Sequence, residues 1–187
     1  MGKLVLTAFM SLDGVIADPG DWQGPFFSED FDEFVTQRTR NTEAILIGRK
    51  TYDIFAGSWP APTGNEFVDR IYSMPKYVVS TTLDKAEWNN STIISDDVER
   101  RVAELKEQHA GDIVIHGVGP LAHTMLQAKL VDELEMWVHP VLLGKPDPQG
   151  LLVRDGTNLA LKLTRTQTLS SGIIICFYET DKDSTLE

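Results

Sequence analysis

Cysteine is almost absent from this sequence of 187 residues, because Cys176 is the only one. A single cysteine excludes an intrachain disulfide and fits a reducing compartment such as the cytoplasm. Cys176 lies within the apolar run Ile173–Phe177. We therefore expect a buried, unreactive thiol here rather than a nucleophile.

Positive charge is also scarce, since 17 lysines and arginines face 28 aspartates and glutamates, which gives a formal net charge of −11. Proteins that bind nucleic acid or anionic membranes through phosphates need a basic patch, so we expect neither partner. An acidic chain can still bind a phosphate where backbone amides and a few cations converge. Charge therefore excludes some partners and leaves a phosphorylated small molecule open.

Long apolar runs are missing as well. Runs such as Ala44–Gly48 and Ile173–Phe177 are far shorter than the roughly 20 residues of a membrane helix, and the N-terminus does not read as a signal peptide. The sequence shows no repeat and no linker. We expect one domain over residues 1–187, with a core from about 3 to 178 and a solvated acidic tail at 179–187.

The order of the remaining patterns predicts an α/β fold. Apolar strand patterns alternate with helical patterns over the first two thirds of the chain, and strand patterns then follow one another. This order predicts a mainly parallel sheet with antiparallel strands added late. The late strand patterns are Glu133–Val138, Leu159–Thr168 and Gly172–Tyr178. The first and last of them fit either the core or a dimer interface.

Gly48-Arg49-Lys50-Thr51 follows a predicted strand and opens a predicted helix. Glycine lets a ligand approach the backbone, and a helix N-terminus offers unpaired N–H groups to an anion. Arg49 and Lys50 add two cations and Thr51 a hydroxyl, a set suited to a nucleotide phosphate. An exposed helix start with ordinary surface cations explains the same residues.

Two more strand ends carry similar chemistry. Ser80, Thr81 and Thr82 follow one strand pattern, and their hydroxyls can bond phosphate oxygens. His116-Gly117-Val118-Gly119-Pro120 follows another and permits a tight turn into a helix, although it lacks the third glycine of a dinucleotide fingerprint. Ordinary loops explain each motif alone. Their joint occurrence at strand ends predicts one cofactor site, because ligands of such sheets bind at the carboxyl ends of the strands.

These segments resemble the dihydrofolate reductase-like superfamily. The likeness lies in Leu-Thr-Ala-Phe-Met-Ser-Leu-Asp-Gly-Val-Ile-Ala, Ile-Leu-Ile-Gly-Arg-Lys-Thr-Tyr, Val-Val-Ser-Thr-Thr and His-Gly-Val-Gly-Pro-Leu, which run in order from about Lys3 to Tyr178. The sequence is most similar to stand-alone relatives of the C-terminal reductase domain of the bifunctional riboflavin-biosynthesis deaminase–reductase. The resemblance implies a three-layer fold with helices on both faces of a mixed sheet, NADPH as hydride donor, and a homodimer.

The resemblance also implies which residues hold NADPH. Gly48, Arg49, Lys50 and Thr51 would meet its phosphates, and Ser80, Thr81 and Thr82 its 2′-phosphate and ribose. The pyrophosphate would lie on Gly117, Val118, Gly119, Pro120 and Leu121. The nicotinamide would be flanked by Ala8, Val15 and Ile16. The zinc-binding deaminase half is missing, so no metal is expected.

The resemblance carries over less completely to the residues that would bind the substrate. The resemblance places a catalytic carboxylate on the first helix, for which we take Asp32, although a solvated acidic helix start explains it equally. Asp13 would orient a substrate amine or a water, or it would cap the turn before Gly14. The expected substrate contacts are the aromatic residues Trp22, Phe26, Tyr52 and Trp59. Local packing is their alternative role, and His116 and His139 are expected to be structural.

Together these features predict an NADPH-dependent reductase in which the loop Asp13–Pro25 closes over a small heterocycle of pterin or aminopyrimidine type. The resemblance implies an activity similar to 5-amino-6-(5-phosphoribosylamino)uracil reductase. The segment Tyr52–Pro60 departs from the family pattern, so the phosphoribosyl substrate stays open. A dihydrofolate reductase proper and a non-catalytic NADPH-binding module are the alternatives.

Overall fold

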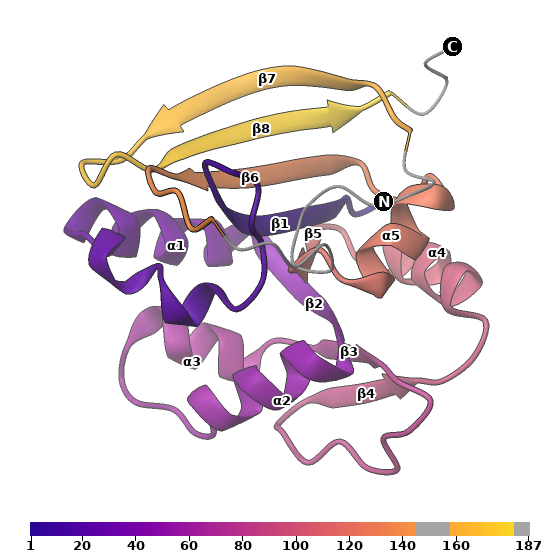
Figure 1. Cartoon of the computed structure of the whole chain (residues 1–187). Helices are drawn as coiled ribbons and strands as arrows, with labels where there is room; N and C mark the ends of the chain where they lie inside the picture. The colour runs from indigo at the N-terminus through magenta and orange to yellow at the C-terminus, as the bar shows by residue number, and fades with distance from the viewer. Residues whose placement is uncertain (145–157, 182–187) are drawn as a thin grey trace.

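A single twisted sheet runs through the molecule in the strand order β4-β3-β2-β5-β1-β6-β8-β7 (Figure 1). The computed structural model describes residues 1–144 and 158–181. The strands are β1 (Leu4–Ser11), β2 (Thr42–Gly48), β3 (Lys76–Val79), β4 (Ser91–Ile94), β5 (Asp112–His116), β6 (Glu133–His139), β7 (Leu161–Thr168) and β8 (Ile174–Thr180). The α-helices are α1 (Glu29–Asn41), α2 (Arg49–Ser58), α3 (Glu66–Ser73), α4 (Val98–Gln108) and α5 (Pro120–Gln127).

Strands β1 to β6 are parallel to one another, and β8 and β7 are antiparallel additions beside β6. This confirms the predicted mixed sheet with late antiparallel strands. The carboxyl ends of six strands therefore meet at one edge of the sheet. β1 and β6 extend beyond β5, because Thr7 pairs with the last residue of β5 while β1 continues to Ser11.

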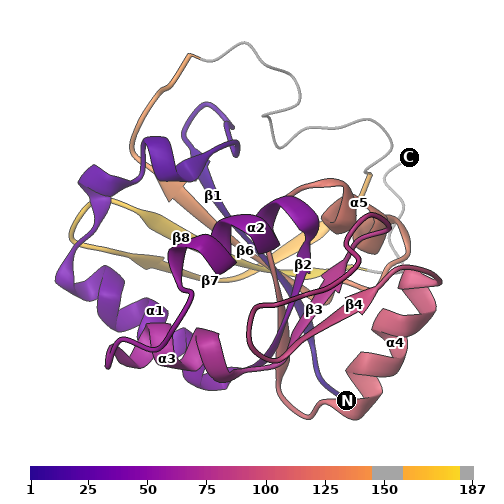
Figure 2. The same ribbon diagram turned by 90° about the horizontal axis from the view of Figure 1, so that it is seen from below.

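The sheet is covered by helices on both faces, which gives the three layers that the resemblance implies. Alternate residues of a strand point to opposite faces. Leu4, Leu6 and Ile115 pack under α4 and α5. On the other face, the β2 side packs against α2 and α3 and the β6 side against α1, and these three helices lie together on one side of the sheet in Figure 2.

Helix α1 illustrates how local sequence sets an element. Acidic residues occupy its first turn and Arg38 and Arg40 its last turn, as the helix dipole favours. Phe31 and Phe34 are buried on its inner face. Ser28 holds the predicted N-cap position, but its hydroxyl donates to Asp30 Oδ1 at 2.5 Å rather than capping a backbone N–H.

The end of the chain differs slightly from the sequence prediction. β8 continues to Thr180, two residues past the predicted end of the core, because Glu179 pairs with Glu133 and with Lys162 of the two neighbouring strands. The rest of the predicted tail, from 182, lies outside the described residues. β6 and β8 are interior strands, so neither offers a free edge, and the two edge strands of the sheet are β4 and β7.

No helix among residues 1–144 and 158–181 has both the length and the apolar character to cross a membrane.

Candidate functional site

The three motifs predicted to bind a cofactor lie side by side. β3, β2 and β5 are neighbours, with Gly48 paired to Val79 and Leu46 to Ile115. The turns that leave these strands therefore emerge next to one another at the carboxyl edge. We call this region, made of Gly48–Thr51, Ser80–Thr82 and Gly117–Leu121, the phosphate edge.

The N-terminus of α2 is open at the phosphate edge. Gly48 is its N-cap residue, and no side chain caps the helix there. A Cβ atom added to Gly48 would meet nothing within 4 Å, so the backbone is accessible. Arg49 Nε lies 2.8 Å from Asp53 and Lys50 Nζ 3.0 Å from Asp18, both as exposed ion pairs. Such pairs contribute little stability and can rearrange around an anion.

The hydroxyls after β3 have two different roles. The Ser80 hydroxyl is 3.2 Å from the backbone nitrogen of Thr82 and 3.1 Å from that of Leu83, and it accepts both N–H groups. Ser80 is buried, whereas Thr81 and Thr82 are exposed. Ser80 thus shapes the turn, and the two threonines are the hydroxyls that face solvent.

The turn after β5 offers its backbone rather than its side chains. Gly117 has a φ of +86°, a left-handed conformation that favours glycine. Val118 is buried in the core under α4 and α5, and Leu121 packs against the same core. Gly119 is the uncapped N-cap residue of α5, and Pro120 occupies the first turn. The free amides at this helix start are therefore the groups that can meet an anion.

The residues expected beside the nicotinamide are mostly buried. Ala8 is 5% exposed and Val15 2% exposed, and Ile16 is half-buried. The Val15 N–H donates to the hydroxyl of Ser11, which is itself fully buried at the end of β1. The start of this loop is thus fixed to the strand by a buried hydrogen bond.

Asp13 lies on this loop and fastens it to the segment after β6. Its carboxylate accepts the Ser11 hydroxyl at 2.6 Å, the Leu143 N–H at 3.1 Å and the Gly144 N–H at 2.8 Å. These hydrogen bonds, that of Ser11 first, lower the pKa of Asp13 to about 2. Asp13 is therefore an ionised latch at neutral pH, which suits a positioning role and not proton donation.

The carboxylates of α1 are arranged differently from the expectation for Asp32. Asp32 is exposed in the first turn of the helix. Its neighbour Asp30 accepts bonds from Ser28 and from both the N–H and the hydroxyl of Ser170 in the β7–β8 turn. Those bonds, that of Ser28 first, lower the pKa of Asp30. α1 thus directs one acid to solvent and uses another to hold a turn.

Aromatic rings fill the space between β1, β6, α1 and the β1–α1 loop. Ring centroids are 5.2 Å apart for Phe9 and Trp137, and 5.0 Å apart for Trp22 and His139. The pairs meet edge to face, the geometry that aromatic quadrupoles favour. We call this set the aromatic cluster; its members are Phe9, Trp22, Phe26, Phe31, Phe34, Trp137 and His139.

His139 lies at the centre of the aromatic cluster, with no exposed surface. Its Nδ1 is 2.9 Å from the Trp137 carbonyl. Burial lowers the pKa of His139, and the carbonyls of Trp137 and Met10 oppose that effect only in part. The structural role expected for His139 fits this environment.

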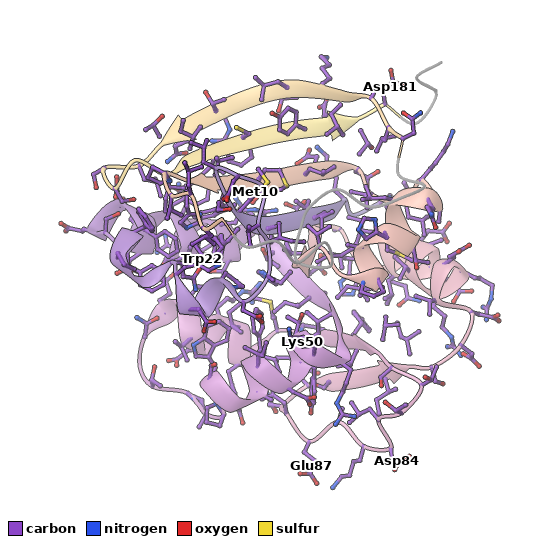
Figure 3. The ribbon with its side chains drawn as sticks, in the orientation of Figure 1. Met10, Trp22, Lys50, Asp84, Glu87 and Asp181 are labelled. Atoms are coloured by element: carbon purple, nitrogen blue, oxygen red, sulfur yellow. The ribbon has the colours of Figure 1, made fainter. Side chains whose placement is uncertain are left out.

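Met10 and Trp22 lie around the β1–α1 loop, with Lys50 on α2 beyond them, while Asp84 and Glu87 lie on the distant β3–β4 loop (Figure 3).

Two of the four expected aromatic contacts belong to the core around α2. Tyr52 is 6% exposed, and its hydroxyl accepts the Trp88 N–H at 3.0 Å. Trp59 packs on Phe55 and Phe67, and its carbonyl accepts the Trp88 indole N–H. Tyr52 is therefore committed to packing, since it lies on the inner face of its helix, away from the phosphate edge.

No group of three or more His, Cys, Asp or Glu side chains is placed to hold a metal ion within the part of the chain that the structure describes. A shallow hollow of about 240 Å³ lies at the opposite edge of the sheet, lined by Lys3, Asp132, Glu133, Glu179 and Thr180. Its lining includes no residue of the phosphate edge.

His116, which the sequence analysis expects to be structural, ends β5 directly before the glycine turn of the phosphate edge. In the sequence, the position of this histidine directly after the apolar run Ile113–Ile115 is the feature that indicates a side chain at the carboxyl edge of the sheet.

Comparison with known proteins identifies the relatives of this chain. The uncharacterized protein YyaP of Bacillus subtilis (strain 168) is 31% identical over 183 residues, which cover 94% of each chain. The structure is similar to a putative riboflavin biosynthesis protein from Shewanella sp. PV-4, with a TM-score of 0.73, 19% identity and coverage of 96% of this chain and 99% of that one. It is also similar to dihydrofolate reductase from Enterococcus faecalis complexed with NADP(H), with a TM-score of 0.63, 16% identity and coverage of 96% and 97%.

These structural likenesses confirm the dihydrofolate reductase-like fold. The model of the RibD C-terminal domain family matches residues 2–175, which is nearly the whole chain. The chain therefore belongs to the RibD C-terminal domain family.

Proposed function

We propose that this protein is a reductase that binds NADPH at the phosphate edge and transfers its hydride to a small heterocycle of pterin or aminopyrimidine type. The main support for this proposal is that two uncapped helix N-termini, those of α2 and α5, lie at the same edge of the sheet as the exposed residues Thr81 and Thr82. Helix N-termini are suited to phosphates by their free amides and dipoles. The family and the NADP(H) complex of the E. faecalis relative point the same way.

The shape of the phosphate edge fits such a ligand. A Cβ atom on Gly48 or Gly119 would meet no atom of the described residues within 4 Å beyond the glycine's own chain neighbours, as expected where a ligand approaches the backbone. Arg49 and Lys50 would turn from Asp53 and Asp18 to the phosphates. These two cations favour NADPH over NADH, because the 2′-phosphate adds two negative charges.

When bound, NADPH supplies the hydride, and the chain supplies position and a water-poor environment. Asp13 and the buried Ser11 hold the β1–α1 loop against the segment after β6. A loop fixed in this way can cover the reacting atoms and exclude water. We propose a reaction similar to that of 5-amino-6-(5-phosphoribosylamino)uracil reductase, in the cytoplasm, where the free thiol of Cys176 stays reduced.

Titration with NADPH and NADH, followed by quenching of tryptophan fluorescence, tests the cofactor. We expect selective binding of NADPH and a loss of about 10- to 100-fold in its affinity in Arg49→Ala, as for a charge-assisted hydrogen bond. Arg40→Ala is the matched control, because Arg40 forms a similar exposed pair with Glu66, next to the amino end of β2. Absence of binding of either nucleotide would refute the proposal.

We also propose that the protein is a homodimer joined through β7. This strand is one of the two edges of the sheet, and seven of its eight residues are exposed. Leu161 and Leu163, with Ile174 on β8, are exposed apolar side chains of this region. A long exposed edge with apolar residues is usually covered by another chain. Light scattering should give twice the monomer mass for the wild type and the monomer mass for Leu163→Lys, and a wild-type monomer would contradict the proposal.

A further inference from the structure

His116 occupies an exceptional position at the carboxyl edge. It is the last residue of β5 and pairs with Thr7 of β1, whose carbonyl accepts the Gly117 N–H at 2.8 Å. Ile113 and Ile115 point into the core under α4 and α5, so His116 points to the opposite face. There its ring lies 5.3 Å from the ring of Phe55 on α2. His116 thus stands between the glycine turn of the phosphate edge and the face covered by α1 and α2.

The imidazole of His116 is chemically uncommitted. It is half-buried, and neither ring nitrogen has a hydrogen-bond partner within residues 1–144 and 158–181. His109, in contrast, bonds Tyr77, and His139 bonds a backbone carbonyl. Burial, aided by the charge of Arg38, lowers the pKa of His116 to about 4. At neutral pH the ring is therefore uncharged and offers one donor and one acceptor.

Several neighbouring side chains on this face are already engaged in other contacts. Glu135 shares the cross-strand row of Thr7 and His116, but its carboxylate accepts a 2.6 Å hydrogen bond from Arg38 Nε. One row further, Phe9 and Trp137 belong to the aromatic cluster, which is packed ring against ring. A flat heterocycle that entered from the phosphate edge would therefore meet the imidazole over β5, with Phe55 as an apolar wall.

We propose that His116 is a substrate-positioning residue whose imidazole hydrogen-bonds an uncharged amide-type edge, a ring N–H or C=O, of the substrate heterocycle while Phe55 packs beside it. The inference rests on the proposed function, because it assumes that the cofactor lies on the adjacent turns. A neutral imidazole matches either an N–H or a carbonyl through its choice of tautomer. It does not match a phosphate, so any phosphate on the substrate lies elsewhere.

Histidine resonances of the ¹³C-labelled full chain provide a direct test, with 5-aminouracil as the probe and NADP⁺ present at saturation. The probe should shift the signal of His116 and leave that of the fully buried His139 unchanged. His116→Leu should weaken 5-aminouracil binding about tenfold, the effect of one lost hydrogen bond. His116→Asn, which keeps a donor and an acceptor, should stay within about threefold of the wild type. NADPH affinity, measured by tryptophan quenching, should be the same in all three proteins.

The outcomes separate this inference from the proposed function. Equal affinity of the wild type and His116→Leu for 5-aminouracil would overturn the role of His116, as would failure of the probe to bind the NADP⁺-loaded wild type. A parallel fall in NADPH affinity in His116→Leu would also overturn it, because the residue would then act on the cofactor turn. If NADPH itself does not bind, the proposed function fails and this inference with it, before any probe is added.

Discussion

The phosphate edge and the aromatic cluster lie on the same sheet but are built in opposite ways. The phosphate edge consists of glycine turns, uncapped helix starts and exposed polar side chains. The aromatic cluster is packed ring against ring, and Trp137 and His139 are 3% and 0% exposed. The first region leaves its hydrogen-bonding groups accessible, whereas in the second the side chains are buried against one another. The comparison shows that accessible polar groups and packed apolar surface are carried by separate residues here.

The largest expected effect comes from emptying the aromatic cluster. Trp137→Ala should lower the free energy of unfolding by about 3 to 5 kcal/mol, because a large buried ring leaves a cavity. Urea denaturation followed by circular dichroism measures this loss. Trp137→Phe is the control; it keeps a ring and removes a buried indole N–H that has no partner among the described residues, so it should lose much less. Similar stability of Trp137→Ala and the wild type would contradict the division between the two regions.

Adding a methyl group at the phosphate edge should lower NADPH affinity and leave the stability of the fold nearly unchanged. Gly48→Ala and Gly119→Ala place a Cβ where nothing lies within 4 Å, so the free energy of unfolding should stay within about 0.5 kcal/mol of the wild type. NADPH affinity should fall about tenfold, because the methyl group keeps phosphate from the backbone amides. Gly57→Ala, also in open space but on α2 away from its start, serves as the control for binding. Unchanged affinity in both variants would remove the glycines from the cofactor site.

Acid should weaken the aromatic cluster through His139. Its pKa is lowered in the folded state by burial, and the ordinary value is 6.5. Below pH 6.5 the unfolded chain therefore binds more protons than the folded one, and stability decreases as the pH falls. His139→Phe should flatten this decrease in melting temperature between pH 7 and pH 5. An unaltered pH profile in His139→Phe would contradict this assignment.

The smallest expected effect concerns the Asp13 latch. Its folded pKa of about 2 lies below the ordinary 3.8, so its contribution to stability is present above pH 4 and is lost as the pH falls towards 2. The difference in melting temperature between wild type and Asp13→Asn should therefore shrink over that interval. Asp32→Asn is the matched control, since Asp32 is an exposed carboxylate outside the latch. A difference that persists at pH 2 would mean that Asp13 acts through its shape and not its charge.

Much of the fold follows from local sequence. Buried parallel strands are short apolar runs, so the patterns at Leu4–Met10 and Ala44–Gly48 predict β1 and β2 nearly to the residue. Glycine and hydroxyl residues directly after such runs predict the turns of the phosphate edge, because the residues that follow a parallel strand lie at the carboxyl edge of the sheet. The ends of β7 and β8 were less accessible to prediction, because they depend on pairing with distant strands and not on neighbouring residues.

The substrate side shows where local sequence stops being informative. Asp30 and Asp32 are alike in sequence, yet one holds the β7–β8 turn and the other faces solvent. Tyr52 lies four residues after Gly48, but the inner face of α2 buries it against Trp88. In both cases the packing partner comes from a distant part of the chain. Helix rotation relative to the sheet, set by that packing, decides which side chain reaches a site.

The sequence alone determined the α/β class, the mainly parallel sheet and the position of glycine- and hydroxyl-containing turns at strand ends, because each is encoded in residues that are neighbours along the chain. Only the tertiary structure decided that β5 lies between β1 and β2, and therefore that His116 stands next to Thr7 and Phe55, with ring nitrogens that have no hydrogen-bond partner among the described residues. Strand order and register are set by which apolar faces can be buried together. That information is shared among segments a hundred residues apart.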